Sequence, residues 1–183
     1  MKHDMKKLIE RNRELELENS QLNSRLNELE QYQRLNNIEI KGLPDNCDEL
    51  AAVKLIGTKL GEPLDVHDID LCHKIRIPNS VQKNVIVRFT RRSKRNEILA
   101  KARKARLTTE SLGFDGTSKP VFLNEHLTPK NKQLLGAAVA RKKEVGWKFV
   151  WTAEGKILAR RGESTPIMRI ASMSDVERMP TGN

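Results

Sequence analysis

The sequence predicts an α+β protein in three parts: an N-terminal coiled coil, a βαββαβ domain and a small α+β C-terminal domain. Apolar residues recur about every 3.5 positions before residue 35. Strand-like and helix-like segments then alternate up to residue 125. A capped helix and a β-hairpin follow. We place the parts at 1–34, 35–125 and 126–180, with a disordered tail at 181–183.

Residues 1–34 carry a narrow apolar seam with charged flanks, which is typical of a coiled coil rather than a lone amphipathic helix. Asn12 and Asn19 lie in the seam, and in parallel coils such Asn often favours dimers. Arg25 and Glu30 instead fit a trimer-specifying pattern, so we favour a trimer over a dimer. The predicted oligomerisation residues are Leu8, Asn12, Leu15, Asn19, Leu22, Arg25, Leu26, Leu29 and Glu30.

The second part alternates strands and helices. Its predicted elements are strands at 37–42, 68–77, 84–90 and 120–124 and helices at 49–60 and 91–106. The order βαββαβ is the ferredoxin-like pattern that RNA-recognition (RRM) domains use. Of the aromatic positions with which such domains stack bases, only Phe89 has a match, and residues 38–40 have none. We therefore expect Phe89 in the core and no base-reading sheet.

The segment 91–106 has the densest positive charge of the chain. It holds eight Lys or Arg and one Glu, so +7 of the net charge of +10 lies there. Like charges at i,i+3 and i,i+4 repel each other, and bound phosphates would relieve that repulsion through counterion release. A solvated helix face is the alternative. We expect Arg91, Arg92 and Arg95 to serve binding with little role in folding.

The third part begins at a helix start. Thr128 is an N-cap followed by Pro129, and Gly146 is a C-terminal stop. A hairpin is expected at 147–161, a third strand at 166–170 and a short helix at 174–179. The aromatics at 147, 149 and 151 alternate onto one strand face, where they either close the core or leave one ring free to stack on bases.

Binding chemistry is therefore expected on the basic helix and on the hairpin. The candidate nucleic-acid-binding residues are Arg88, Arg91, Arg92, Lys94, Arg95, Lys101, Arg103, Lys104, Arg106, Lys142, Lys143, Lys148, Trp151, Arg160 and Arg161.

Other classes of function find no support in the sequence. No nucleophile or paired-carboxylate motif points to an enzyme or a cofactor, and residues 113–119 lack the spacing of a phosphate loop. Cys47, Cys72 and the histidines lack zinc-ligand spacing, and two cysteines suggest a reducing, intracellular compartment, cytoplasm or nucleus. No apolar run is long enough to span a membrane.

Three strings carry a resemblance to a known family: residues 68–75, 123–128 and 147–151. With them, residues 36–179 resemble the C-terminal region of the baculovirus few-polyhedra (FP) family and its insect retroelement relatives. Residues 83–90 and the basic helix also look like the third strand and second helix of the first-open-reading-frame (gag-like) proteins of LINE-type retrotransposons. Insect relatives often carry a zinc-binding or basic region before the coil, whereas this chain begins within the heptads, as expected of a truncated or separately retained form.

The resemblance implies a homotrimeric protein that prefers single-stranded RNA, coats its own transcript and acts as a nucleic-acid chaperone. By position, the RNA-contacting arginines that it implies are Arg88, Arg91, Arg92, Arg95, Arg160 and Arg161. We expect sequence-nonspecific binding of single-stranded RNA, and of single-stranded DNA, with phosphates in a cleft between the two folded parts. An oligomeric structural or virion-associated adaptor is the main alternative. A DNA-binding regulator is a third reading, which would require discrimination of base edges.

Overall fold

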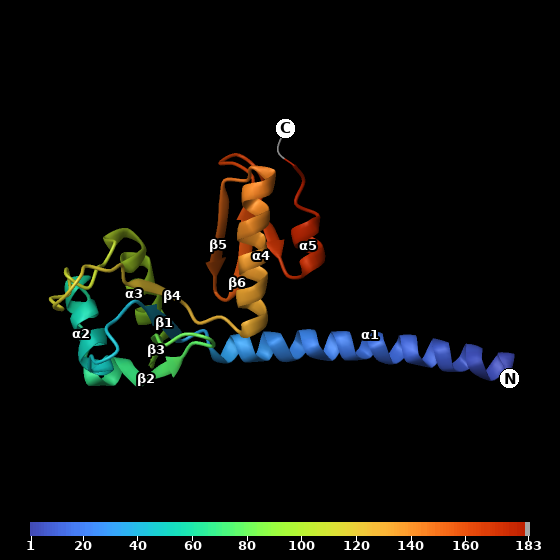
Figure 1. Ribbon diagram of the computed structural model, residues 1–183, viewed down its shortest axis with the longest axis horizontal. Helices are drawn as coiled ribbons and strands as arrows, with labels where there is room; N and C mark the ends of the chain where they lie inside the picture. The colour runs from blue at the N-terminus through green and yellow to red at the C-terminus, as the bar shows by residue number, and fades with distance from the viewer. Residues whose placement is uncertain (182–183) are drawn as a thin grey trace.

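The computed structural model describes residues 1–181 (Figure 1). Helix α1 (Lys2–Gln33) forms a long rod. A unit with a four-stranded sheet lies at the C-terminal end of this rod. The C-terminal unit lies against the side of the rod, next to the four-stranded unit. The predicted mixed α+β class, with two antiparallel sheets, is confirmed. Of the predicted tail, residues 182–183 lie outside the described part of the chain.

The four-stranded unit follows the predicted order of elements. They are β1 (Asn37–Lys41), α2 (Glu49–Lys59), the short 3₁₀ helix η1 (Val66–Asp68), β2 (Ile69–Arg76), β3 (Lys83–Phe89), α3 (Arg92–Ala105) and β4 (Phe122–Glu125). The strand order in the sheet is β2-β3-β1-β4, and all three pairings are antiparallel. Both central strands, β1 and β3, therefore lie between neighbours, and β2 and β4 form the edges.

The core of this unit lies on one face of the sheet. Because side chains alternate across a strand, Ile38 and Ile40 of β1 point to the same face. There they join Phe89 of β3, Ile56 of α2 and Ile98 of α3 in one buried cluster. Phe89 is a core residue, as predicted.

The C-terminal unit packs one long helix and one short helix on a small sheet. Its elements are α4 (Pro129–Val145), β5 (Phe149–Ala153), β6 (Lys156–Arg160), β7 (Met168–Ile170) and α5 (Met173–Glu177). The Thr128 side chain caps α4 by accepting a hydrogen bond from Asn131 N, and Gly146 ends the helix in the left-handed conformation. The strand order is β5-β6-β7, so one edge of β5 is free of strand partners.

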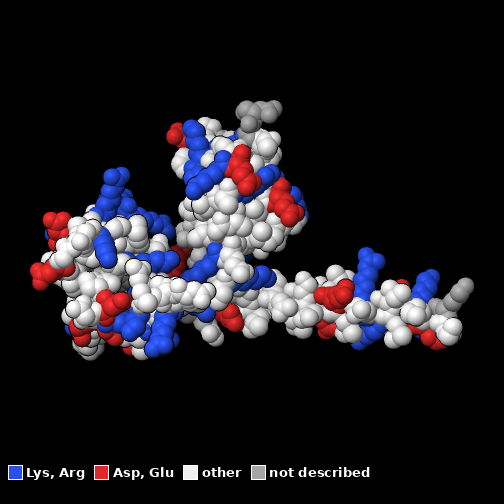
Figure 2. All heavy atoms as spheres, in the orientation of Figure 1, with Lys and Arg blue, Asp and Glu red and all other residues white. Residues whose placement is uncertain are grey.

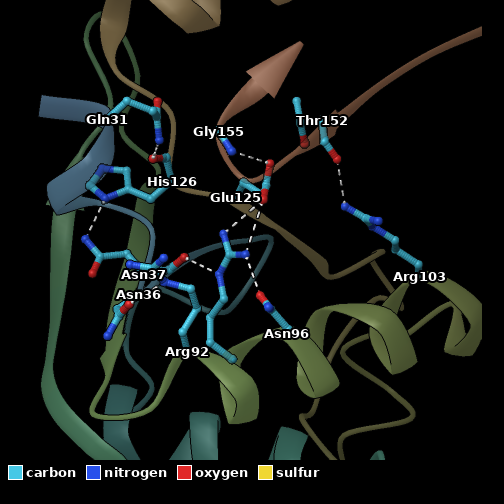
Figure 3. A network of polar contacts seen from close by, with 11 residues as sticks. Gln31, Asn36, Asn37, Arg92, Asn96, Arg103, Glu125, His126, Thr152 and Gly155 are labelled. Carbon is cyan, nitrogen blue, oxygen red and sulfur yellow. Dashed lines mark hydrogen bonds and ion pairs between the residues drawn. The ribbon is translucent and has the colours of Figure 1, made fainter. Parts of the chain in front are cut away.

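The β5–β6 turn joins the three parts of the chain (Figure 3). The Glu125 carboxylate accepts a hydrogen bond of 3.2 Å from Gly155 N. Gln31 of α1 lies so close that a Cβ on Gly155 would be 2.5 Å from its Cγ. The Gln31 amide also donates to His126 O and accepts from Thr128 N. These bonds fix the C-terminal unit against both α1 and the four-stranded sheet.

One face of α1 holds the C-terminal unit, and another carries the apolar seam. Asn27, Gln31 and Arg34 bond to residues 126–131. Leu22, Leu26 and Leu29 of the seam are more than half exposed. With Asn12 and Asn19 at a positions of the heptad, Asn27 and Arg34 fall on b positions and Gln31 on an f position, on the side of the helix away from a and d. No described helix is both long and apolar enough to cross a membrane.

Candidate nucleic-acid interface

Several of the predicted binding cations have acidic partners from distant parts of the chain. The pairs are Arg88–Asp70, Arg91–Asp68, Lys94–Glu62, Lys101–Glu62 and Arg95–Glu125. The hydrogen bonds from Lys101 and Lys94 lower the pKa of Glu62 to about 2. The expectation of an uncompensated charge run at 91–106 was therefore wrong for these residues. Counting charge along the chain misses these partners, which lie 18 to 39 residues away.

Arg95 is the clearest correction. It was predicted to serve binding with little role in folding, but its side chain is 4% exposed and pairs with Glu125, which is 3% exposed. Its Nε donates to Asn37 O at 3.2 Å, and its Nη1 donates to Asn96 Oδ1 at 2.9 Å. Burial lowers the pKa of Arg95, and the charge of Glu125 opposes that change. Arg95 therefore joins α3 to β1 and β4 instead of facing solvent.

Other cations of the basic helix have no carboxylate partner among the described residues. Arg92 donates from Nε to Asn36 Oδ1, and its guanidinium carbon lies 5.5 Å from the centre of the Tyr32 ring. Arg103 donates to Thr152 O on the free edge of β5. Lys104 and Arg106 are exposed at the end of α3. These cations remain available to an external anion.

A notch separates α3 from β5. Its floor is a cavity of about 170 Å³ lined on one side by Asn96, Ala100 and Arg103 of α3, and on the other by Ala153 and Glu154. Figure 2 shows Lys and Arg side chains on both folded units, whereas the cations that line the notch itself, Arg95 and Arg103, both come from α3. The notch is a narrow, open site between the two folded units.

A second cavity, of about 490 Å³, lies at the start of β5. It brings together four of the predicted residues: Lys142, Lys148, Trp151 and Arg160. Phe149 also lines it, on the same strand face as Trp151 and opposite Arg160 in the β5–β6 register. Lys143 of α4 is exposed but does not line the cavity, and Arg161 follows directly after β6.

The prediction that all three aromatics share one strand face was wrong. Trp147 precedes β5, is buried with Ala138 and Ile157, and donates its indole N–H to Pro180 O at 2.9 Å. Because the tight end of α4 at Gly146 turns the chain before the strand begins, Trp147 does not follow the alternation of Phe149 and Trp151. One tryptophan therefore closes the core, and the other lines an accessible cavity.

The sheet face opposite the helices is partly closed by a contact that the sequence did not predict. Glu39 of β1 is 2% exposed, accepts a hydrogen bond from Asn84, and pairs with Lys132 of α4 at 3.0 Å. Burial raises the pKa of Glu39, but the hydrogen bonds from Lys132 and Asn84 outweigh it and the pKa is lowered. The sequence signal that could have indicated this contact is the position of the Glu39 carboxylate between two apolar residues, Ile38 and Ile40.

The predicted oligomerisation residues lie along one exposed stripe of α1. Leu8, Leu15 and Leu22 are 67%, 46% and 56% exposed. Arg25 and Glu30 are also exposed, and neither forms an ion pair within residues 1–181. The stripe is available to a partner helix along most of its length.

The cysteines are poor candidates for thiolate chemistry. Burial raises the pKa of Cys72 to about 11 and also raises that of Cys47. Within the described residues, no group of three or more His, Cys, Asp and Glu side chains could hold a metal ion.

Comparison with known proteins adds a similarity for the C-terminal part. A search of curated proteins finds no match to the chain. The family described as Baculovirus FP protein domain 2 matches residues 128–180. This range runs from the cap of α4 to the residue that accepts the Trp147 hydrogen bond, so it covers the whole folded C-terminal unit. The C-terminal unit is thus similar to domain 2 of the baculovirus FP protein.

Proposed function

We propose that this protein binds single-stranded RNA, and single-stranded DNA, mainly through phosphates, and that it acts as a nucleic-acid chaperone. The observation that carries the proposal is that cations without an ion-pair partner among the described residues lie at both ends of β5, one in the notch and the others in the cavity at the start of the strand. Arg103 lies at the floor of the notch, and Lys142, Lys148 and Arg160 lie at the far end of β5. Cations along a groove track a nucleic-acid backbone, and aromatic side chains beside them stack on bases without reading them.

The four-stranded unit is RRM-like in this proposal. Its order βαββαβ, with β1 and β3 central and antiparallel, supports that view. The usual route over the sheet is obstructed here, because Lys132 reaches Glu39 on the face where RRM domains stack bases. In this proposal the nucleic-acid strand therefore lies in the notch and not on the sheet. A retroelement or virus-like role is proposed because the order of parts, a long N-terminal helix, an RRM-like unit and a small C-terminal unit, resembles that of the FP family and of LINE-type first-open-reading-frame proteins.

A coiled coil through α1, preferably of three chains, completes the proposal. Leu22, Leu26 and Leu29 are exposed, and the C-terminal unit is held by another face of the helix. Copies of α1 can therefore pack along the seam without displacing that unit. Linked copies bind a long strand with avidity, because each later contact is intramolecular.

The test is a salt series with single-stranded RNA. The observed affinity should fall steeply as salt rises, since bound phosphates release counterions. The triple variant Arg103→Gln/Lys104→Gln/Arg106→Gln should bind more weakly, and the magnitude of its log–log salt slope should fall by about 2. The matched control Lys59→Gln/Arg76→Gln/Lys119→Gln removes the same charge from exposed sites elsewhere on the four-stranded unit.

Two outcomes would contradict the proposal. A flat salt response would favour the structural or virion-associated adaptor instead. Equal losses in the two triple variants would show that net charge, and not the notch, governs binding.

A further inference from the structure

A pocket of about 480 Å³ lies where α1, α4 and the β5–β6 turn meet. Glu154 lines both this pocket and the notch, so a strand in the notch reaches the pocket at that residue. The wall on α1 includes Glu28 and Tyr32. We define this junction pocket by its charged and aromatic side chains: Glu28, Tyr32, Arg92, Lys130, Glu154, Lys156 and Arg169.

The charged groups of the junction pocket do not neutralise each other. Arg92, Lys130, Lys156 and Arg169 face the same space as two carboxylates, yet among the described residues none of these groups forms an ion pair. Cations there suit a phosphate, and the carboxylates suit a neutral group with N–H donors. A nucleotide offers both, because its phosphate is an anion and its base edge donates.

The pocket also has a surface on which a base can stack. The Arg92 guanidinium lies over the Tyr32 ring at 5.5 Å, and its Nε is held by Asn36. The Tyr32 ring remains 66% exposed. Splayed-out bases of single-stranded RNA stack on aromatic rings and on guanidinium planes. This pair therefore offers an aromatic ring and a guanidinium side by side as a platform on which a base can stack.

Glu154 holds an unusual backbone position at the entrance. Its φ is +50° and that of Gly155 is +73°, a pair of left-handed residues in a two-residue hairpin turn. Asn, Asp or Gly is favoured at the first of these positions, and a glutamate there is strained. Its carboxylate is nevertheless exposed and without an ion-pair partner within residues 1–181. A binding role for the Glu154 carboxylate would explain why a glutamate occupies this turn position.

We propose that the junction pocket binds one nucleotide of a single strand, with guanine preferred over uracil. Guanine presents N1–H and N2–H side by side, so both can donate to the two carboxylate oxygens of Glu154. Uracil has one N–H between two carbonyl oxygens, which repel a carboxylate. The base stacks on the Tyr32–Arg92 platform, and Lys130, Lys156 or Arg169 meets the phosphate. This inference rests on the proposed function and adds a base preference to it.

The experiment measures the affinity of the full-length chain for three short RNA oligomers at one salt concentration. One contains only uridine, one has scattered guanosines, and one has inosines at the same places, which lack the N2 amino group. The guanosine oligomer should bind about tenfold more tightly than the uridine oligomer, with inosine between them. Glu154→Gln should abolish the guanosine preference without weakening uridine binding. Glu177→Gln, which removes an exposed carboxylate of the same unit, should keep it.

Tyr32 provides a second variant. Tyr32→Leu should lower the affinity for the guanosine oligomer, and Tyr32→Phe should restore it, since the ring is what stacks. Equal affinity for all three oligomers in the wild-type chain, with a steep salt response, would overturn the junction pocket and leave the notch intact. A guanosine preference retained in Glu154→Gln would also overturn it. Absence of binding to every oligomer would overturn both proposals.

Discussion

At the scale of single residues, Arg95 and Glu125 show how much a buried charge depends on its partner. Both side chains are almost fully buried, and each makes further bonds, to Asn37 O and to Gly155 N. Arg95→Met should lower the free energy of unfolding by about 3–5 kcal/mol, because it leaves the Glu125 carboxylate buried without a counter-charge. Urea unfolding followed by circular dichroism measures this loss.

Arg103→Met is the control, because Arg103 is exposed on the same helix and has no carboxylate partner among the described residues. Its stability should change by less than about 1 kcal/mol. Similar losses in the two variants would mean that helix propensity, and not the buried pair, decides stability.

A second prediction concerns His126, at the junction between the units. The Arg34 guanidinium can only donate, so His126 Nε2 accepts from it at 3.2 Å, and Nδ1 of the ring lies 3.0 Å from Asn37 Nδ2. Burial, and then the charge of Arg34, lowers the pKa of His126 from 6.5 to about 4. Between these pH values the unfolded chain binds more protons, so stability should decrease as the pH falls from 6.5 to about 4.

His126→Gln should have a smaller pH dependence of unfolding in that window, because the group that takes up the proton is gone. His67→Gln, at an exposed position, should keep the wild-type slope. The prediction fails if the two variants have the same slope.

Residue roles were harder to predict from the sequence than residue types. Local counting found the basic run, but it could not show that Glu62, Asp68 and Glu125 form ion pairs with four of its members. The same applies to the junction pocket, whose side chains come from five separate stretches of chain. These sites arise from tertiary proximity, which charge patterning along a sequence does not encode.

At the scale of elements, the periodicity of the sequence was sufficient to predict most of the helices and strands. The strand predicted at 84–90 is β3 (Lys83–Phe89), and the basic helix predicted at 91–106 is α3 (Arg92–Ala105). Val85, Val87 and Phe89 alternate onto the core face of β3, which explains why the strand was recognisable, although Asn84 and Ile86 on the other face are buried too. The predicted hairpin began two residues too early, at 147, because Trp147 precedes β5 and packs in the core of the C-terminal unit. Helix caps and the alternation of apolar residues are local features of the sequence, so the elements that they predict are also found in the folded chain.

The seam of α1 yields a prediction with a matched pair of leucines. Leu22 lies in the seam and is 56% exposed, whereas Leu17 lies at an f position and is 60% exposed. If the chain forms a coiled coil, Leu22→Lys should lower the molar mass measured by light scattering towards that of a monomer, because a charge replaces a knob in the seam. Leu17→Lys should remain oligomeric. Equal behaviour of the two would argue against the seam.

Truncation separates two roles of the same helix. Deletion of residues 1–20 should remove most of the seam and keep Asn27 and Gln31, which bond to Thr128 and Asn131. Deletion of residues 1–33, which the sequence alone would suggest, also removes those bonds. The shorter deletion is therefore the better test of oligomerisation.

At the scale of the whole molecule, oligomerisation should matter only for long strands. An RNA that fits a single notch should bind the Leu22→Lys variant and the wild-type chain equally well. An RNA long enough to engage several copies should bind the wild-type chain about a hundredfold or more tightly, through effective concentration. Fluorescence anisotropy with a ladder of RNA lengths measures this, and a ratio independent of length would contradict it.

The bonds from Asn27, Gln31 and Arg34 give the heptads of α1 a further importance. Because the C-terminal unit is fixed to particular residues of the rod, its angle around the rod in the proposed coiled coil would be set by which residues of α1 face the partner helices. A slip of one residue in that choice turns the helix by about 100° about its axis and carries the notch with it. Asn12 and Asn19, far along the rod, would thus decide the direction in which the binding site points.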